Sequence, residues 1–216
     1  MGRRDRTGKR TSRANCVGKR NPNLGYYYIV TDAEKTEKYY LEGLRDSIPE
    51  EFRNKIVIKV DNAPTKQLIK KCREELSIDA QYRKPWIIFD RDKVQNFDKI
   101  IEEAKNYGIE AGWSNPCFEI WLFAYFGEMP NIPDSKQCCK KFAEAYNKRT
   151  RQKYEKSEEN IYGKMCDYGD EEKAFSVARQ KRKQFDKDSI NIPSEMVPCT
   201  RVDILVKEIK DKIKSN

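Results

Sequence analysis

The chain has 216 residues, of which 38% are hydrophobic and 37% charged, and its net charge at pH 7 is +9. It contains no His, which excludes Ser-His-Asp, Cys-His and His-metal sites, so any catalysis must rest on carboxylates, Lys, Arg, Tyr or Cys. Seven Cys without a CxxC pair argue against a disulfide framework and against a tetrahedral zinc site. Because no apolar run is long enough to cross a bilayer and no secretory signal is visible, we expect a cytoplasmic protein that does not associate with membranes.

The charge is distributed unevenly along the chain. Residues 1–24 carry a net charge of +7, residues 25–135 carry −4 and residues 136–187 carry +6. An acidic centre between two basic segments suits a metal-dependent enzyme that acts on a polyanion. We therefore expect a disordered basic arm at 1–24, a metal-site core at 25–135, and a helical basic extension at 136–216 that packs on the core.

Strand and helix patterns alternate about every dozen residues, with links so short that only right-handed crossovers into a parallel sheet are expected. The predicted strands are 25–31, 56–60, 85–89 and 109–113, and the predicted helices are centred on 40–48, 64–78, 97–104, 114–126 and 200–213. In residues 136–187, aromatic side chains alternate with Lys. That pattern fits either a stacking surface for single-stranded nucleic acid or amphipathic helices with a solvated face.

Carboxylates follow several of these strands. Asp90 and Asp92 come directly after the apolar run 85–89, and Asp32 and Asp61 follow two earlier strands. Since the carboxyl ends of parallel strands share one edge of a sheet, the acids can meet there, with strand order deciding which of them do. The structural alternative is that Asp90 caps the strand and Asp92 begins a turn. The functional interpretation is a divalent-metal site built from hard oxygen ligands.

A further carboxylate occurs in the predicted helix 114–126, which begins with Ser114 as N-cap and Pro116 near the first helical position. Apart from Glu119 this helix is almost wholly apolar, so it is expected to be buried. An unpaired buried carboxylate costs at least several kcal/mol. Glu119 is therefore expected to have a metal or a cationic partner, unless it has a capping or surface role.

Four segments together carry a family resemblance: Asp-Ala-Glu-Lys-Thr-Glu-Lys-Tyr-Tyr at 32–40, Phe-Asp-Arg-Asp at 89–92, Ser-Asn-Pro-Cys-Phe-Glu-Ile-Trp at 114–121 and Pro-Cys-Thr-Arg-Val at 198–202. They resemble the TOPRIM metal site and, more closely, the RloB family, which includes AbiLii-like proteins, over roughly residues 25–214. The resemblance implies a TOPRIM-like (Rossmannoid) α/β fold and a role in prokaryotic antiphage defence. It also implies metal-dependent cleavage of nucleic acid and an AAA-type ATPase partner.

The resemblance also implies roles for single residues. Asp90 and Asp92 match the family's paired aspartates, Glu119 its helix glutamate, and Glu37 the second glutamate of its first motif. Where the family usually has Cys-Glu-Gly, this chain has Thr31-Asp32-Ala33, so the acid is one methylene shorter and the glycine is replaced. The segment Ala124-Tyr125 stands where a histidine is common.

The first hypothesis is a metal-dependent nuclease with Mg²⁺ or Mn²⁺ as cofactor. The expected metal ligands are Asp32, Glu37, Asp90 and Asp92, and the expected catalytic set adds Glu119, Lys35 and Arg201. The expected nucleic-acid contacts are Lys35, Arg91, Lys93, Arg149, Arg151, Lys181 and Arg182. RNA, including tRNA, and DNA are both left open as substrates, and the oligomeric state is not predicted.

Two alternatives belong to other classes. The first is a catalytically degenerate subunit that binds nucleic acid or serves as an effector of a defence complex, which the Asp32 and Ala33 replacements favour. The second is an Asp-x-Asp phosphatase of the haloacid dehalogenase type or an Asp-x-Asp nucleotide-sugar transferase. In that phosphatase pattern the acid pair normally follows the first strand, whereas here it follows the third predicted strand, and no Gly-rich nucleotide loop is present.

Overall fold

The computed structural model describes residues 26–53, 57–78, 83–92 and 94–215. The predicted basic arm and Lys93 lie outside the described residues. The strands are β1 (Tyr26–Thr31), β2 (Ile58–Asn62), β3 (Arg83–Asp90), β4 (Glu110–Asn115) and β5 (Cys199–Thr200). The α-helices are α2 (Thr36–Asp46), α3 (Glu50–Arg53), α4 (Leu68–Ile78), α5 (Phe97–Asn106), α6 (Glu119–Tyr125), α7 (Ser135–Thr150), α8 (Ile161–Tyr168), α9 (Glu171–Lys187) and α10 (Val202–Lys214), and the 3₁₀ helices are η1 (Thr65–Gln67) and η2 (Pro193–Glu195).

The strands form one five-stranded sheet in the order β2-β1-β3-β4-β5. The pairs among β1 to β4 are parallel, and β5 pairs with β4 in the antiparallel direction. The predicted mostly parallel α/β sheet flanked by helices is therefore confirmed, and it is compatible with a Rossmann-like or TOPRIM-like fold. Residues 136–216 contribute helices, as expected, and in addition supply β5, one of the two edge strands of the same sheet.

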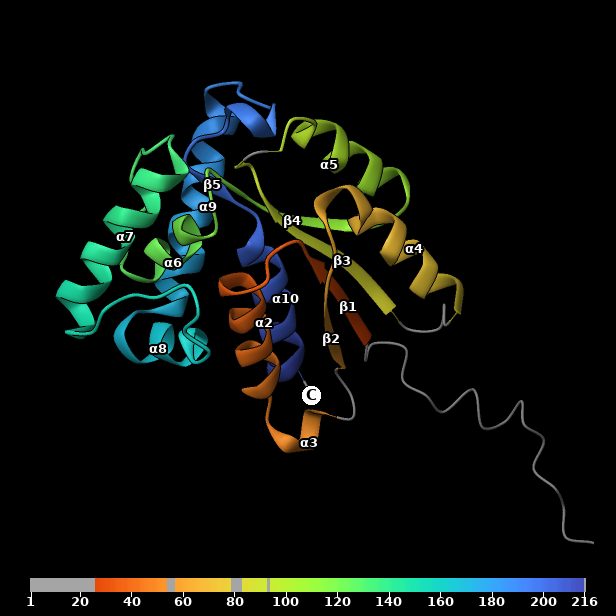
Figure 1. Ribbon diagram of the computed structural model, residues 1–216, viewed down its shortest axis with the longest axis horizontal. Helices are drawn as coiled ribbons and strands as arrows, with labels where there is room; N and C mark the ends of the chain where they lie inside the picture. Colours follow the sequence, from red (N-terminus) through yellow and green to blue (C-terminus); the bar gives the residue numbers. More distant parts are fainter. Residues whose placement is uncertain (1–25, 54–56, 79–82, 93, 216) are drawn as a thin grey trace, which may run out of the picture.

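Helices cover both faces of the sheet, because alternate side chains of the central strands point to opposite sides. Figure 1 shows α4 and α5 on one side of the sheet and α2, α6 and α10 on the other. The first face includes Tyr28 and Val30 of β1 in its core, whereas Tyr27 and Ile29 belong to the larger core, which also contains residues of α2 and of α6 to α10. None of the helices in the described part of the chain combines the length and apolar character needed to cross a bilayer.

The helix predicted to begin at Ser114 begins later. Ser114 and Asn115 are the last residues of β4, and α6 starts at Glu119. The carbonyl of Ser114 accepts a hydrogen bond of 2.8 Å from the backbone N–H of Arg91, and Ser114 also pairs with Thr200 of β5. Strand pairing on both sides thus keeps Ser114 extended, a constraint that the local N-cap pattern does not reveal. Asn115 and Pro116 are joined by a cis peptide bond.

The strand order places a topological switch point between β1 and β3. From β1 the chain crosses to β2 on one side, and it then returns to build β3 and β4 on the other side. In open α/β sheets, ligands bind in the crevice beyond the carboxyl ends of the strands at such a point. Asp32 directly follows β1, and Asp90 is the last residue of β3, so both acids lie at the switch point.

Candidate metal centre at the carboxyl edge of the sheet

Asp90 lies at the centre of a group of carboxylates. Its Oδ2 accepts a hydrogen bond of 3.0 Å from the backbone N–H of Phe118. Its Oδ1 is buried and has no hydrogen-bond partner among the described groups. Burial raises the pKa of Asp90 well above its ordinary value, and the negative charges of Glu37, Glu119 and Asp32 raise it further. A proton or a metal cation is needed to balance this charge.

Glu37 lies in the first turn of α2 and is buried. Burial, followed by the negative charge of Glu119, raises the pKa of Glu37 to about 7. The negative charge of Glu37 in turn raises the pKa of Asp90, so the two carboxyl groups influence each other's protonation. Among the described residues, the ligand oxygens of Asp32, Glu37 and Asp90 do not all lie within 4.8 Å of one another.

Asp32 contributes from the end of β1. Its Oδ2 accepts a hydrogen bond from the hydroxyl of Thr65, the first residue of η1. Burial raises the pKa of Asp32, although the Thr65 bond opposes the rise. The negative charge of Asp32 acts on both Glu37 and Asp90. The sequence predicted that the acids after the first and third strands could meet. In the fold these acids are Asp32 and Asp90, and they lie near enough for the charge of Asp32 to raise the pKa of Asp90.

Glu119 is 1% exposed at the start of α6 and has a cationic partner. Its Oε1 lies 3.1 Å from Lys156 Nζ and accepts a hydrogen bond of 3.1 Å from the hydroxyl of Tyr154. Burial by itself would raise the pKa of Glu119, but the positive charge of Lys156 contributes to holding it below the ordinary value. The sequence required a metal or a cation for Glu119 without identifying which. Lys156 supplies the cation.

The segment that carries Tyr154 and Lys156 joins α7 to α8 and is tied to the start of α2. The Thr36 hydroxyl donates a hydrogen bond of 3.2 Å to the carbonyl of Lys156 and lies 3.3 Å from the Tyr154 hydroxyl. Sequence reasoning gave neither Tyr154 nor Lys156 a role at the carboxylates. The only signal for them was the alternation of aromatic and Lys residues in 136–187, which does not specify a partner.

Three predicted residues lie around the same edge with different surroundings. Asp92 is exposed, and its backbone N–H bonds to the carbonyl of Pro116 at 3.2 Å. Lys35 is exposed at the N-cap position of α2. The guanidinium of Arg91 donates a hydrogen bond of 3.1 Å to the carbonyl of Val94 and lies 5.7 Å from the centre of the Phe97 ring. These contacts hold the Arg91 side chain against the start of α5.

The remaining predicted residues do not join the carboxylates. Arg201 lines a small cavity with residues at the amino end of β4, away from the carboxyl edge. Arg182 forms a two-pronged pair with Asp203, with N···O distances of 2.6 and 2.7 Å. Lys181 is partly buried on α9.

Arg149 and Arg151 lie at the end of α7. The Nε of Arg149 donates a hydrogen bond of 2.9 Å to the carbonyl of Tyr168, and its guanidinium lies 5.1 Å from the centre of the Phe126 ring. Arg151 is exposed and ends α7 with a left-handed backbone at φ 62°. Among the described residues, no hydrogen bond or ring contact of the Arg151 guanidinium is found, so of these two arginines only Arg151 has an unengaged charge at the surface.

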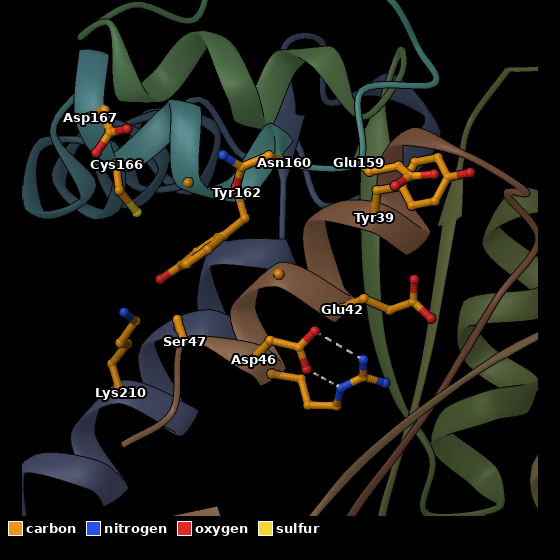
Figure 2. Close-up of a pocket in the computed structure, with 13 residues that line it drawn as sticks. Tyr39, Glu42, Asp46, Ser47, Glu159, Asn160, Tyr162, Cys166, Asp167 and Lys210 are labelled. Carbon is orange, nitrogen blue, oxygen red and sulfur yellow. Dashed lines mark hydrogen bonds and ion pairs between the residues drawn. The ribbon is translucent and has the colours of Figure 1, made fainter. Parts of the chain in front are cut away.

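A surface groove of about 880 Å³ lies between α2, α8 and α10, and Figure 2 shows its lining. Tyr39 and Glu159 lie at one end and Ser47 and Lys210 at the other, while Asp46 is paired with Arg45 at 2.7 Å. None of the four clustered carboxylates lines it. The groove is therefore distinct from the carboxylate centre.

By its fold and by this centre, the chain is an α/β protein with a carboxylate cluster at the switch point of a mostly parallel sheet. The family described as RloB-like protein matches residues 27–209, so the chain belongs to the RloB-like family. Comparison with curated proteins gives no match, and neither does comparison with solved structures.

Proposed function

We propose that this protein is a metal-dependent nuclease that cleaves phosphodiester bonds in RNA or DNA. The observation that carries the proposal is the convergence of Asp32, Glu37, Asp90 and Glu119 from four separate elements, with a buried Asp90 oxygen that has no donor. Raised carboxylate pKa values at a switch point are typical of functional sites. A purely structural cluster of this charge would destabilise the fold.

The donor set fits Mg²⁺ or Mn²⁺, because these ions prefer carboxylate oxygens. Asp32, Glu37 and Asp90 would hold the ion, and Asp92 would contribute from the exposed turn that follows β3. When bound, such an ion polarises a phosphoryl oxygen and lowers the pKa of a water molecule. Thr65 would keep the shorter acid, Asp32, oriented toward the site through its hydroxyl.

Cationic side chains would bind and orient the nucleic acid. Although burial opposes it, the charge of Glu119 raises the pKa of Lys156, so this lysine is a cation at neutral pH and not a general base. Its position beside the carboxylates suits charge-assisted contacts to a phosphate. Lys35 is exposed at the start of α2, two residues before Glu37, and would add a second phosphate contact.

The test incubates the purified protein with mixed tRNA and with plasmid DNA in Mg²⁺, in Mn²⁺ and in EDTA. Asp90→Asn is the inactive variant, and Asp134→Asn is the matched control, since Asp134 is an N-cap where Asn also functions. We expect metal-dependent cleavage that is lost in Asp90→Asn and retained in Asp134→Asn. Equal cleavage by both variants would overturn the proposal, and so would cleavage of neither polymer that persists after a cognate ATPase and ATP are added.

Membership of the RloB-like family supports a role in prokaryotic antiphage defence together with an AAA-type ATPase. The alternative is a degenerate subunit that binds nucleic acid without turnover, and the replacements at Asp32 and Ala33 favour it. Repeating the incubation with a cognate ATPase and ATP separates the two. Cleavage that appears only with the ATPase supports a partner-dependent nuclease, whereas salt-dependent binding without cleavage supports the alternative.

A further inference from the structure

The geometry points to a second metal site, for a thiophilic divalent ion such as Zn²⁺, formed by Cys117, Cys139 and Glu119. Each residue offers one ligand atom, and these atoms all lie within 4.8 Å of one another. Cys117 precedes α6, Glu119 begins it, and Cys139 lies on α7. The proposal goes beyond the nuclease proposal, because this site can hold an ion whether or not the chain cleaves nucleic acid.

The spacing of the two sulfur atoms fits tetrahedral zinc. Cys117 Sγ and Cys139 Sγ lie 3.9 Å apart. Two thiolates bound to one zinc ion at about 2.3 Å with tetrahedral angles are separated by about 3.8 Å. A disulfide would need a sulfur separation of about 2.05 Å. The observed separation therefore matches two ligands of one ion without a large movement of α7 against α6.

The ligand chemistry selects an ion different from the one at the carboxylate centre. Thiolates are soft ligands that favour Zn²⁺ over Mg²⁺, whereas Asp32, Glu37 and Asp90 offer only hard oxygen atoms. Two cysteines and one glutamate leave the fourth tetrahedral position for water or for another ligand. Because Glu119 belongs to both groups of side chains, an ion held by the thiols would lie beside the carboxylate centre.

The surroundings of Glu119 supply a suitable second shell. Lys156 and Tyr154 both contact Oε1, which fixes the orientation of the carboxylate. Two thiolates and one carboxylate carry one negative charge more than a divalent ion neutralises, and the Lys156 ammonium offsets that excess. The lysine therefore stabilises the site with its metal bound, and it does not have to move away for the metal to bind.

Without a metal the same thiols are protonated. Hydrogen bonding to Cys138 and, to a smaller extent, burial raise the pKa of the Cys117 thiol. Hydrogen bonding to Cys117, followed by burial, raises the pKa of the Cys139 thiol. Cys117 Sγ donates to the carbonyl of Ser135 at 3.8 Å. Metal binding would displace these protons, so the affinity should increase with pH. Sequence spacing conceals the site, because the two cysteines are 22 positions apart.

The experiment titrates reduced, chelator-treated full-length protein with Co²⁺ and follows the thiolate charge-transfer band and the tetrahedral d–d bands. Zn²⁺ is then added to displace the cobalt and to measure its affinity. Cys139→Ser and Cys117→Ser remove a thiol, and Cys166→Ser is the matched control because Cys166 is exposed on α8. We expect one equivalent of Co²⁺ with thiolate bands in the original protein and in the control, and at least 100-fold weaker binding in the two other variants.

Thiolate bands that persist unchanged in both Cys139→Ser and Cys117→Ser would overturn the proposal, as would their absence from the original protein. Loss of two thiols on air oxidation, without metal binding, would likewise overturn it in favour of a disulfide. Glu119→Gln retains both thiols, so it tests the site even if a cysteine variant fails to fold, and at least tenfold weaker binding is expected. Asp90→Asn is expected to keep the cobalt spectrum, which separates failure of this site from failure of the nuclease proposal.

Discussion

The ammonium of Lys156 lies 3.1 Å from Oε1 of Glu119, although the glutamate side chain is 1% exposed and the lysine side chain 56% exposed. The pair joins the basic segment after α7 to the buried helix α6. It places a solvent-accessible cation beside a group of buried and half-buried carboxylates. Lys156 thus both neutralises Glu119 and remains within reach of a ligand at the edge of the sheet.

Replacing Lys156 with Ala should destabilise the protein, because the buried Glu119 carboxylate then loses its cation. We expect the free energy of unfolding to fall by about 1–2 kcal/mol, a value reduced from that of a fully buried pair because Lys156 is screened by solvent. Urea unfolding measures the change. Lys153→Ala is the control, since Lys153 is paired with Glu155 at the surface, and it should cost less than about 0.5 kcal/mol. Equal losses in the two variants would contradict the expectation.

The stability of the metal-free protein should decrease as the pH rises from about 5 to 7. The pKa of Glu37 is 4.5 in the absence of the fold and about 7 in it, so the folded state binds a proton that the unfolded state releases between these values. Each unit of such a shift corresponds to about 1.4 kcal/mol. Melting temperatures in EDTA at pH 5.5 and 7.5 measure the effect. Glu37→Gln should show a smaller difference between the two pH values, and an unchanged difference would show that other groups are responsible.

Asp90→Asn should stabilise the metal-free protein while removing its response to Mg²⁺. The substitution removes an ionisable group whose charged form is disfavoured by burial and by the negative charges of Glu37, Glu119 and Asp32. We expect a gain of about 1 kcal/mol, which raises Tm by about 2–4 °C in a chain of this size. Thermal melts with and without Mg²⁺ provide the measurement. The Asp134→Asn control should keep the metal response, and a metal response that survives in Asp90→Asn would place the ion elsewhere.

Thr65→Val should weaken Mg²⁺ binding without removing a ligand. The Thr65 hydroxyl donates to Asp32, and outer hydrogen bonds of this kind contribute about tenfold or more to metal affinity. Calorimetric titration of Mg²⁺ measures the loss. Thr65→Ser keeps the hydroxyl and should retain most of the affinity. If Thr65→Ser is as weak as Thr65→Val, the methyl group and not the hydrogen bond is responsible.

Arg182→Ala should affect folding more than nucleic-acid binding. The guanidinium of Arg182 pairs with the buried Asp203 and donates a further hydrogen bond to the carbonyl of Thr200, which ties α9 to β5 and α10. Leaving Asp203 without a partner should cost about 3–5 kcal/mol. Arg179→Ala, an exposed position on the same helix, is the control and should cost less than about 0.5 kcal/mol. A loss of affinity for tRNA in Arg182→Ala without a loss of stability would assign Arg182 to the binding surface instead.

Local patterns in the sequence were sufficient for the α/β class and for the position of Asp32 and Asp90. Apolar β-favouring runs, short crossovers and acids at strand ends are features of neighbouring residues, and parallel pairing brings those ends to one edge. The same patterns failed at Ser114, because pairing with β3 and β5 outweighs an N-cap preference.

Contacts between distant segments were decided only by the tertiary structure. Tyr154 and Glu119 are 35 positions apart, and their contact depends on how the segment after α7 returns to the start of α6. Cys117 and Cys139 meet for a related reason, through the packing of α7 against α6. The alternation of Lys and aromatic residues shows that 136–187 has polar and apolar faces, but it does not specify which lysine neutralises Glu119 or which arginine is bound to Asp203. Those partners are selected by the packing of helices on the face of the sheet that carries the larger core. Burial there makes an unpaired charge costly.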